Sequence, residues 1–384
     1  MSLRVLITGS TPGLGLAFQF VQLAVWLRGQ GVDVVMTGCD GEATPGLFDS
    51  LREAGVAFHD VPGLRRTGVP ELLRPAGDLR ELIKALRPDA AIITAVGHLA
   101  ETRGIDRGHT GVVWWLQSVR NTTRYAGLAR RLAAWVVNRH ADQAWVQCEL
   151  ERRHMTRYGL REDFTRLVPT PVDVRWWRSR AKEPLPAEFA KVAEAKAARR
   201  PILVYPASLL PAKRHDTLLR ATAIVKRKFP KVFLCCPGRF RADPLIPLVR
   251  ELQLEEQVMF TESLVRQEAI PPLLAVADVH VFPSAGETYG KALIEAWCIG
   301  TPTVMTRVGV GLEAEQAGVA RVGDIGDHES MARSIMEILG DPALAARMRE
   351  KSRTWIDENY SFEAVGGKMI GLMEESRRRR GGPI

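Results

Sequence analysis

The chain is poor in cysteine, and its few cysteines are not spaced to bind a metal or to form a disulfide framework. There are five in 384 residues, an odd number, with no Cys-x-x-Cys or Cys/His ligand spacing among them. This argues against a zinc site and against a disulfide-stabilised secreted domain. A reducing cytosol is therefore the expected compartment. The cysteines are Cys39, Cys148, Cys235, Cys236 and Cys298.

The sequence also lacks an apolar run of the roughly 18 to 20 residues that a membrane-spanning helix needs. Its most apolar stretch, Leu14 to Leu27, follows a predicted strand and a Gly/Pro turn, and Gln19 and Gln22 interrupt it. No small-residue cleavage site follows, so we expect a buried helix and not a signal peptide. Any membrane contact is then peripheral. The predicted location is cytoplasmic, with contact at the inner face of the membrane left open.

Acidic residues are outnumbered by basic ones. Asp and Glu total 44 against 53 Lys and Arg, which gives a net charge of +9, and four arginines run from Arg377 to Arg380. This balance fits an acidic substrate or an anionic membrane surface as well as a solvated tail. Aromatic residues make up 7% of the chain and are not interleaved with basic ones, so no nucleic-acid partner is expected.

Short apolar strands alternate with helical patterns along most of the chain, which is typical of parallel α/β sheets. The strands fall into two series, separated by a Lys-, Ala-, Glu- and Pro-rich segment at residues 175–200 that we predict to be a linker. The length also suits two domains. The predicted strands are Arg4–Thr8, Val32–Thr37, Ala57–Val61, Ala90–Thr94, Val112–Trp115 and Gln143–Val146, then Pro201–Tyr205, Lys231–Cys235, Val258–Phe260, Val279–Phe282 and Thr303–Met305.

The predicted architecture is α/β, with two facing Rossmann-like doubly wound domains. The first covers residues 1–174 and the second residues 201–355, and residues 356–384 form a C-terminal helix that crosses back to the first domain and a basic tail. Folds of this kind bind ligands at the carboxyl ends of their strands. Two such domains that face each other are expected to form an interdomain cleft, where the chemistry takes place.

Two glutamates flank a predicted strand-to-helix turn in the second domain. Glu287 and Glu295 lie in Pro283–Ala296, which reads PSAGETYGKALIEA. Pro and Gly end the preceding strand, and a helix is expected to begin near Tyr289 or Gly290. Its first N–H groups, those of Gly290, Lys291 and Ala292, suit a phosphate. Carboxylates beside an anion site suit sugar and ribose hydroxyls, so the pattern predicts a nucleotide-sugar site.

This strand, Pro-Ser turn, Glu, Tyr-Gly pair and second Glu in an Ala-rich helix resembles the signature of family 4 retaining glycosyltransferases (glycosyl transferases group 1), which have the GT-B fold. The resemblance extends over nearly the whole chain. It implies retaining transfer of a sugar from a nucleotide-diphosphate-sugar donor to an acceptor hydroxyl. Glu287 would be catalytic by orienting the donor sugar and stabilising positive charge on its anomeric carbon, and Glu295 would hold the ribose.

The same resemblance places Tyr289, Gly290 and Lys291 in the donor-binding turn. Lys213 falls on the family's lysine that contacts the donor diphosphate, while the arginine usually near it is Ser208 here. Arg214 and Arg239 are the candidates to replace that arginine. The chain has no Asp-x-Asp pair of the metal-dependent kind, so neither a metal nor a cofactor other than the donor substrate is expected.

Four substrate contacts are predicted in the first domain. Gly13 and Gly15, in the Gly-rich turn after the first strand, would let the backbone approach the donor phosphate or the acceptor. His98 would line the acceptor side. Gln117 stands where the family has a histidine, so it keeps a hydrogen-bonding role without a proton-transfer role.

Two alternatives stay open at this point. The turn Thr8–Gly15 also resembles that of short-chain dehydrogenases, which use a nicotinamide dinucleotide, but no tyrosine is followed by a lysine four residues later. The loss of the usual arginine and histidine is compatible with a non-catalytic GT-B binding or regulatory protein. The nucleobase, the sugar, the oligomeric state and the acceptor, which could be a carbohydrate, a small molecule or a lipid-linked molecule, are not determined by these residues.

Overall fold

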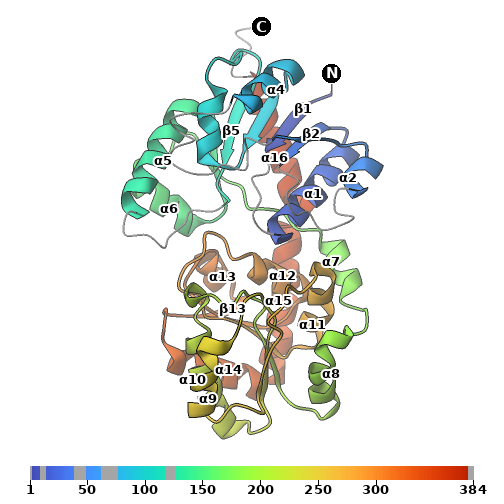
Figure 1. The fold of residues 1–384 in the computed structure, drawn as a ribbon, viewed down its shortest axis with the longest axis vertical. Coiled ribbons are helices and arrows are strands. Elements are labelled where there is room, and N and C mark those ends of the chain that lie inside the picture. Colours follow the sequence, from blue (N-terminus) through green and yellow to red (C-terminus); the bar gives the residue numbers. More distant parts are fainter. Residues whose placement is uncertain (1, 9–13, 39–48, 62–76, 118–125, 379–384) are drawn as a thin grey trace. The chain divides into compact units, whose positions relative to one another are not determined.

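The computed structural model of the chain describes residues 2–8, 14–38, 49–61, 77–117 and 126–378, which form two compact units (Figure 1). Unit 1 comprises Met1–Val172 together with Ser361–Ile384. Unit 2 is the continuous segment Asp173–Tyr360. The predicted α/β class with two Rossmann-like halves is confirmed.

Unit 1 is built on a parallel sheet with the strand order β3-β2-β1-β4-β5-β6-β7. The order reverses beside β1, as in doubly wound folds. Strands β4, β5 and β6 are buried over their whole length, because helices cover both faces of the sheet. The strands are β1 (Arg4–Thr8), β2 (Asp33–Gly38), β3 (Ala57–Asp60), β4 (Ala90–Ile93), β5 (Gly111–Trp115), β6 (Gln143–Val146) and β7 (Thr165–Leu167).

Two apolar clusters lie on the two faces of this sheet. One packs α1 (Leu14–Gly29), the π-helical turn η7 (Phe362–Gly366) and α16 (Gly367–Arg378) against the strands. The other packs α4, α5 and α6 with the 3-10 turn η2. The remaining helices of the described part of unit 1 are α2 (Asp49–Glu53), α4 (Asp78–Leu86), η2 (Val96–Thr102), α5 (Ala126–His140) and α6 (Glu149–Arg157).

Unit 2 repeats this design with a six-stranded parallel sheet in the order β10-β9-β8-β11-β12-β13. Its order reverses at β8 and β11, so the loops after these strands flank a topological switch point. The strands are β8 (Ile202–Val204), β9 (Phe233–Cys236), β10 (Val258–Phe260), β11 (Val279–Phe282), β12 (Thr303–Thr306) and β13 (Ala320–Gly323).

The helices of unit 2 alternate with these strands along the chain. They are α7 (Val174–Arg180), η3 (Ala187–Phe189), α8 (Ala190–Ala197), η4 (Pro211–Lys213), α9 (His215–Lys228), η5 (Asp243–Leu245), α10 (Ile246–Glu251), η6 (Gln267–Ala269), α11 (Ile270–Val276), α12 (Lys291–Ile299), α13 (Gly311–Ala317), α14 (His328–Gly340) and α15 (Pro342–Asn359).

The unit boundaries differ from the predicted domain boundaries. Residues 175–200, predicted to be a linker, form α7, η3 and α8 within unit 2, because Trp177, Phe189 and Val192 are fully buried there. Lys, Ala and Glu, which made this segment resemble a linker, are strong helix formers. At the other end, residues 356–359 complete α15, and the chain enters unit 1 at Ser361.

The predicted strands all recur, within a residue or two at their ends. Strands β7 and β13 were not predicted, because each is short and carries an arginine in place of a continuous apolar run. Across the described ranges, no helix is long and apolar enough to cross a bilayer.

Candidate active site

The predicted strand-to-helix turn of unit 2 lies between β11 and α12. Helix α12 begins at Lys291, one or two residues later than predicted, with Gly290 as its N-cap at φ +92°. A Cβ on residue 290 would also lie 2.7 Å from Cδ1 of Leu293, so a glycine is needed for both reasons. The first N–H groups of an α-helix have no intrahelical acceptor. The turn therefore places the first N–H groups of α12 and the positive end of its helix dipole at the carboxyl edge of the sheet.

Lys213 and Glu287 form an ion pair beside this turn, although 74 positions separate them. Lys213 comes from the loop after β8 and Glu287 from the loop after β11. Ser284 adds a hydrogen bond of 2.8 Å from its hydroxyl to the same Oε1 of Glu287. The side chains of Lys213 and Glu287 are 27% and 16% exposed, so both charges remain accessible.

Buried polar groups fix the backbone on which this pair is mounted. The Tyr205 hydroxyl donates to the Lys213 carbonyl at 3.1 Å, and the Thr306 hydroxyl donates to the Ser284 carbonyl at 2.6 Å. Burial, with a contribution from the Glu287 charge, raises the pKa of Tyr205 well above its usual value, so its hydroxyl keeps its proton. Burial and the neighbouring Lys213 charge lower the pKa of His215 to about 4, which keeps this ring neutral at pH 7.

The second predicted glutamate, Glu295, lies in α12 and is almost fully buried. Its Oε1 lies 3.4 Å from Nζ of Lys291, and Nε2 of Gln267 donates to the same oxygen at 3.1 Å. Burial raises the pKa of Glu295, and the Lys291 charge opposes this rise. Burial likewise lowers the pKa of Lys291 against the effect of Glu295. Each glutamate of the motif is therefore paired with a different lysine. Lys213, which pairs with Glu287, lies far upstream in the chain, and Lys291, which pairs with Glu295, directly follows Gly290.

The two arginines proposed to replace the family arginine make contacts with other residues. Arg214 forms a bidentate ion pair with Asp216, with both N–O distances 3.0 Å. The Arg239 guanidinium lies 5.6 Å from the ring centroid of Phe240. Lys291, which the sequence already placed in the predicted donor turn, is a second cation there and is paired with Glu295.

Tyr289, predicted to bind the substrate, has a buried side chain that is 5% exposed. Its ring centroid lies 6.3 Å from that of Tyr360, and its carbonyl accepts a hydrogen bond from the Val310 N–H at 3.0 Å. Its side chain thus anchors the turn within unit 2, and its backbone lies next to the amino end of α12.

The predicted residues of unit 1 are only partly described. Gly13 lies outside the described residues, Gly15 is the second residue of α1, and His98 is buried in η2 with 1% exposure. Oε1 of Gln117 accepts hydrogen bonds from Gln147 at 3.3 Å and from Thr170 at 3.2 Å. These three residues follow β5, β6 and β7, so they form a polar network at the carboxyl edge of the unit 1 sheet.

The sequence did not identify Ser284, Gln267, Gln147 and Thr170 as site residues. Two of them could have been found by one signal, since Ser284 and Gln147 come one or two residues after a predicted strand, where ligands of parallel sheets bind. Thr170 follows β7, which the sequence did not predict. Gln267 lies in η6 and carries no comparable signal, because its approach to Glu295 depends on how α11 packs beside α12.

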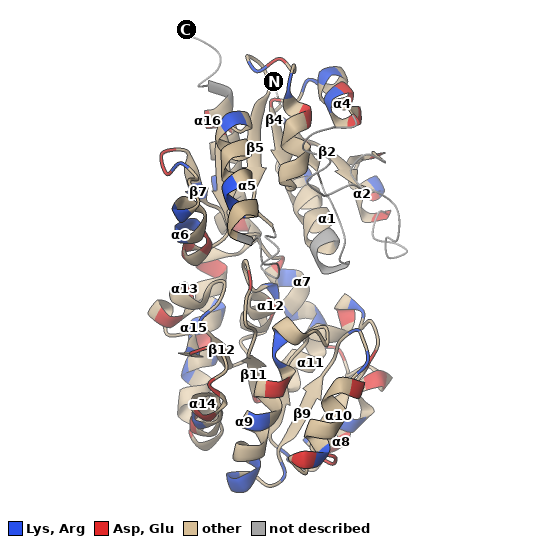
Figure 2. Cartoon of the chain, turned by 60° about the vertical axis from the view of Figure 1, so that its left-hand side comes forward, with Lys and Arg blue, Asp and Glu red and all other residues tan. Residues whose placement is uncertain are grey.

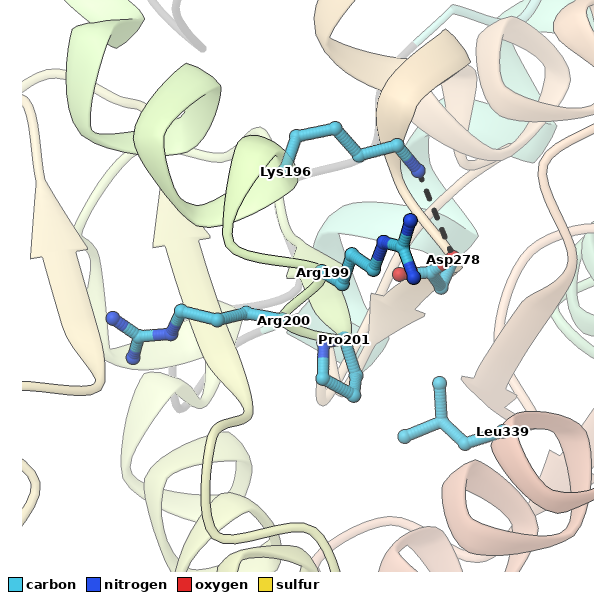
Figure 3. A pocket seen from close by; sticks show the side chains of 6 residues that line it. All are labelled: Lys196, Arg199, Arg200, Pro201, Asp278 and Leu339. Atoms are coloured by element: carbon cyan, nitrogen blue, oxygen red, sulfur yellow. Dashed lines mark ion pairs between the residues drawn. The ribbon is translucent and has the colours of Figure 1, made fainter.

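A pocket of about 310 Å³ lies at the opposite edge of the unit 2 sheet (Figure 3). Pro201 and Asp278 there precede β8 and β11. Asp278 accepts a hydrogen bond from the Ile202 N–H at 2.8 Å and lies 4.0 Å from Nζ of Lys196. The charged groups of this pocket thus help to fix the starts of β8 and β11. The pocket is separate from the site at the carboxyl edge of the sheet. The lining residues are Lys196, Arg199, Arg200, Pro201, Asp278 and Leu339.

Comparisons with known proteins agree with this geometry. Residues 15–171 match the family model described as "Glycosyl transferase 4-like domain", and residues 187–355 match "Glycosyl transferases group 1". The GDP-mannose-dependent alpha-(1-6)-phosphatidylinositol monomannoside mannosyltransferase of Mycolicibacterium smegmatis is 27% identical over 300 residues, which are 69% of this chain and 77% of that protein. The D-inositol 3-phosphate glycosyltransferase of Segniliparus rotundus is 26% identical over 399 residues, which cover 97% and 86% of the two chains.

Among solved structures, Anabaena HepE in complex with UDP-glucose superposes with a TM-score of 0.77 at 16% identity, covering 97% of this chain and all of that one. This likeness establishes the GT-B fold. The two family matches lie one on each unit and together cover most of the chain. The chain therefore belongs to the glycosyl transferases group 1, a family of GT-B enzymes, and it is a glycosyltransferase.

The family match decides among the alternatives that the sequence left open. The dehydrogenase alternative was based on the turn before Gly15 and left unit 2 without a role, whereas the two matches include both units. The non-catalytic alternative was based on a missing arginine and histidine. The chain retains Lys213, Glu287 and Glu295, with Lys213 paired to Glu287, and its relatives are named glycosyltransferases, which favours the enzyme.

Proposed function

We propose that this enzyme transfers a sugar from a nucleotide-diphosphate-sugar to an acceptor hydroxyl with retention of configuration and without a metal ion. The observation that carries the proposal is the Lys213–Glu287 ion pair beside the amino end of α12, at the carboxyl edge of the unit 2 sheet. The relatives support this choice of donor, since one is named as GDP-mannose-dependent and the HepE structure contains UDP-glucose.

Donor binding would exchange the partners of two ion pairs. Lys213 is paired with Glu287 and Lys291 with Glu295, so each charge already has a neighbour of opposite sign. A nucleotide-sugar carries groups that can replace all four: phosphate oxygens for the lysines, and sugar and ribose hydroxyls for the glutamates. Because no charge loses a partner without gaining another, the donor can enter without leaving a buried charge unpaired.

The proposed chemical step makes use of this arrangement. The bond between the anomeric carbon and the diphosphate oxygen breaks, and the acceptor oxygen forms its bond to the same face of that carbon. The proton of the acceptor hydroxyl passes to the departing phosphate oxygen. Glu287 stabilises the positive charge that develops on the sugar, and Lys213 with the amino end of α12 stabilises the negative charge on the leaving group.

The test is the Glu287→Gln variant, which keeps the shape of the side chain and removes its charge. A panel of nucleotide-sugars identifies the donor by thermal shift, because a ligand at 100 times its dissociation constant adds about 2.7 kcal/mol of stability. With that donor, Glu287→Gln is expected to lower the turnover number by about 100-fold or more while thermal stability is kept. Glu329→Gln, an exposed glutamate of α14, is the matched control. Near-normal turnover in Glu287→Gln would remove the catalytic assignment.

Metal independence has its own measurement. The positive charge needed at the diphosphate is supplied here by Lys213, Lys291 and the end of α12. Dialysis against EDTA is therefore expected to leave the rate of transfer unchanged, and restored activity on adding Mg²⁺ or Mn²⁺ to a dialysed, inactive sample would contradict the proposal.

We also propose that the enzyme acts in the cytoplasm and contacts the inner face of the membrane. Four buried cysteines in the described part of the chain, Cys148, Cys235, Cys236 and Cys298, carry free thiols, which suits a reducing compartment. The net charge of +9 suits an anionic surface. Fractionation of cells that produce the chain tests this location, with recovery in both the soluble fraction and a salt-releasable membrane fraction as the expected result.

A further inference from the structure

Helix α5 of unit 1 has one face that the protein core does not use. Leu128, Leu132 and Trp135 are 68%, 36% and 54% exposed, and they recur at spacings of four and three residues. This is the period of a single helical face. Ala134 and Val137 on the opposite side are at most 1% exposed and belong to the core under the sheet. We call Leu128, Arg131, Leu132, Trp135 and Arg139 the α5 face.

The charges on the α5 face are all positive. The helix contains three arginines and neither aspartate nor glutamate. Of the three, Arg131 and Arg139 are exposed, and the Arg139 guanidinium lies 6.0 Å from the ring centroid of Trp135. The neighbouring α6 packs beside α5, and basic residues lie on both helices (Figure 2). Arg157 of α6 is exposed.

Both acidic residues of α6 are accounted for within the protein. Glu149 is held by Arg152 and Arg153 at 2.7 to 2.9 Å, and these arginines lower its pKa. Glu151 is 2% exposed, and burial raises its pKa. The exposed groups of α5 therefore combine large apolar side chains with arginines on a helix that has no acidic residue, and α6 adds Arg157, whereas Arg153 is paired with Glu149.

This combination selects among possible partners. A second copy of the chain docking through the same face would bring arginine against arginine, which is unfavourable without an acidic counterpart. An anionic lipid bilayer supplies the opposite charge at its surface and apolar chains below it. Tryptophan, leucine and arginine on one helical face are the side chains that such an interface favours, with the apolar groups inserted and the guanidinium groups at the phosphates.

We propose that the α5 face docks unit 1 on the surface of a bilayer that contains anionic phospholipid. This inference rests on the membrane location proposed above and gives it a surface and a lipid chemistry. It places the enzyme next to acceptors that are exposed at a membrane. Binding is peripheral and reversible, since one helical face with three apolar side chains buries far less than a membrane-spanning helix.

The experiment is co-sedimentation of the full chain with vesicles of phosphatidylcholine alone and of phosphatidylcholine with 30% phosphatidylglycerol. The chain is expected to bind the anionic vesicles, and binding should weaken as NaCl is raised, because salt screens the arginines. The double variant Leu132→Ser/Trp135→Ser should lower the partition coefficient by at least about tenfold. Arg131→Glu/Arg139→Glu should lower it by at least about fivefold for each position.

Matched controls come from exposed side chains of unit 2. Phe240 and Ile325 are 51% and 48% exposed, so Phe240→Ser/Ile325→Ser removes a similar apolar surface elsewhere. Arg227→Glu/Arg333→Glu reverses two exposed helical arginines. Equal loss of binding in these controls, or equal binding to both kinds of vesicle, would overturn the proposal. A dimer in gel filtration that the Leu132/Trp135 variant dissociates would do so as well, by assigning the face to a second copy.

Hydrolysis of the nucleotide-sugar in vesicle-free buffer separates this proposal from the proposed function. The α5-face variants should keep that activity, because none of their residues belongs to the donor site. Loss of vesicle binding with retained hydrolysis supports the docking surface. Absence of donor turnover in the unmodified chain would contradict the proposed function and leave the vesicle measurement valid.

Discussion

Single residues decide the charge balance of the proposed donor site. The motif supplies two carboxylates, and this chain places a lysine against each: Lys213 on Glu287 and Lys291 on Glu295. Lys291 is the more distinctive of the two, because it begins α12 and brings a cation to a site where Ser208 has replaced the usual arginine. A charged hydrogen bond contributes about 1.5 to 3 kcal/mol, enough for one lysine to compensate for one lost arginine.

Glu295→Gln should weaken donor binding more than it lowers the turnover number. The variant removes one hydroxyl acceptor of the ribose and leaves Lys291 without its 3.4 Å partner, while Glu287 is untouched. We expect the donor dissociation constant to rise by about tenfold or more, as measured by isothermal titration calorimetry. Glu329→Gln again serves as the control. A donor dissociation constant equal to that of the unmodified chain would count against the ribose role.

His280 makes the stability of unit 2 depend on pH. It is fully buried in β11, its ring nitrogens have no hydrogen-bond partner within the described residues, and burial lowers its pKa to about 3. Between the ordinary value of 6.5 and about 3, the unfolded chain binds a proton that the folded chain excludes. The free energy of unfolding therefore decreases as the pH is lowered through this window, by at most about 1.4 kcal/mol for each pH unit from this group.

His280→Leu should flatten this dependence. Leucine fills the site without a titrating group, so the free energy of unfolding of the variant should fall less steeply than that of the unmodified chain between pH 6.5 and 4. Urea denaturation at several pH values measures it. His59→Leu, at an exposed histidine of β3, should leave the slope as it was. Parallel curves for His280→Leu and the unmodified chain would refute this account.

At the scale of elements, the start of α12 depends on a loop from the neighbouring strand. Gly309, after β12, has φ +53°, and a Cβ there would lie 2.2 Å from the Tyr289 carbonyl oxygen. The next residue, Val310, donates its N–H to that same oxygen at 3.0 Å. The donor end of α12 is therefore positioned by backbone packing between two loops, and only a residue without a side chain permits this approach.

Gly309→Ala should displace Tyr289 and Gly290 and thereby the first N–H groups of α12. The donor affinity is expected to fall by at least tenfold, because a shift of the helix end changes every hydrogen bond to the diphosphate. Gly340→Ala, at the last residue of α14, is the matched control, since its added Cβ would meet no atom within 4 Å. Unchanged donor affinity in Gly309→Ala, measured by calorimetry, would show that this contact does not position the helix.

At the scale of the whole molecule, the two units differ in how the chain builds them. Unit 2 is one continuous segment, whereas unit 1 needs the C-terminal segment from Ser361 onward. Phe362, Val365, Met369 and Met373 of that segment are buried in the core that contains β1 and α1. Gln143 and Ser376 add a hydrogen bond of 2.7 Å between β6 and α16. The last two helical segments are thus an integral part of unit 1.

A chain ending at Tyr360 should lose the fold of unit 1 and keep that of unit 2. Removing four buried side chains exposes the apolar faces of β1 and α1. The free energy lost in this way exceeds the net free energy of unfolding of a single domain. Hydrogen exchange should show loss of protection in β1 and β4, with β8 and β11 still protected. A chain ending at Arg378 is the control. Retained protection of β1 in the shorter chain would contradict this role of α16.

The donor turn could be predicted from the sequence because its signals are local. Pro283 ends a strand, Gly290 takes a positive φ, and the two glutamates are fixed by their distance along one turn and one helix. The same is true of the α/β class, since the period of apolar residues is set by hydrogen bonding within a helix or between strands. The linker at residues 175–200 was wrongly predicted because composition does not show whether a helix is buried.

By itself, the sequence determined the alternation of strands and helices, the two halves of the chain and the residues of the donor motif, all of which depend on near neighbours. The tertiary structure decided which charges meet. Lys213 reaches Glu287 across 74 positions only because β8 and β11 are adjacent in the sheet, and Gln267 reaches Glu295 only because α11 packs on α12. It also decided which side of α5 is exposed, since burial depends on what packs against a helix and not on the helix alone.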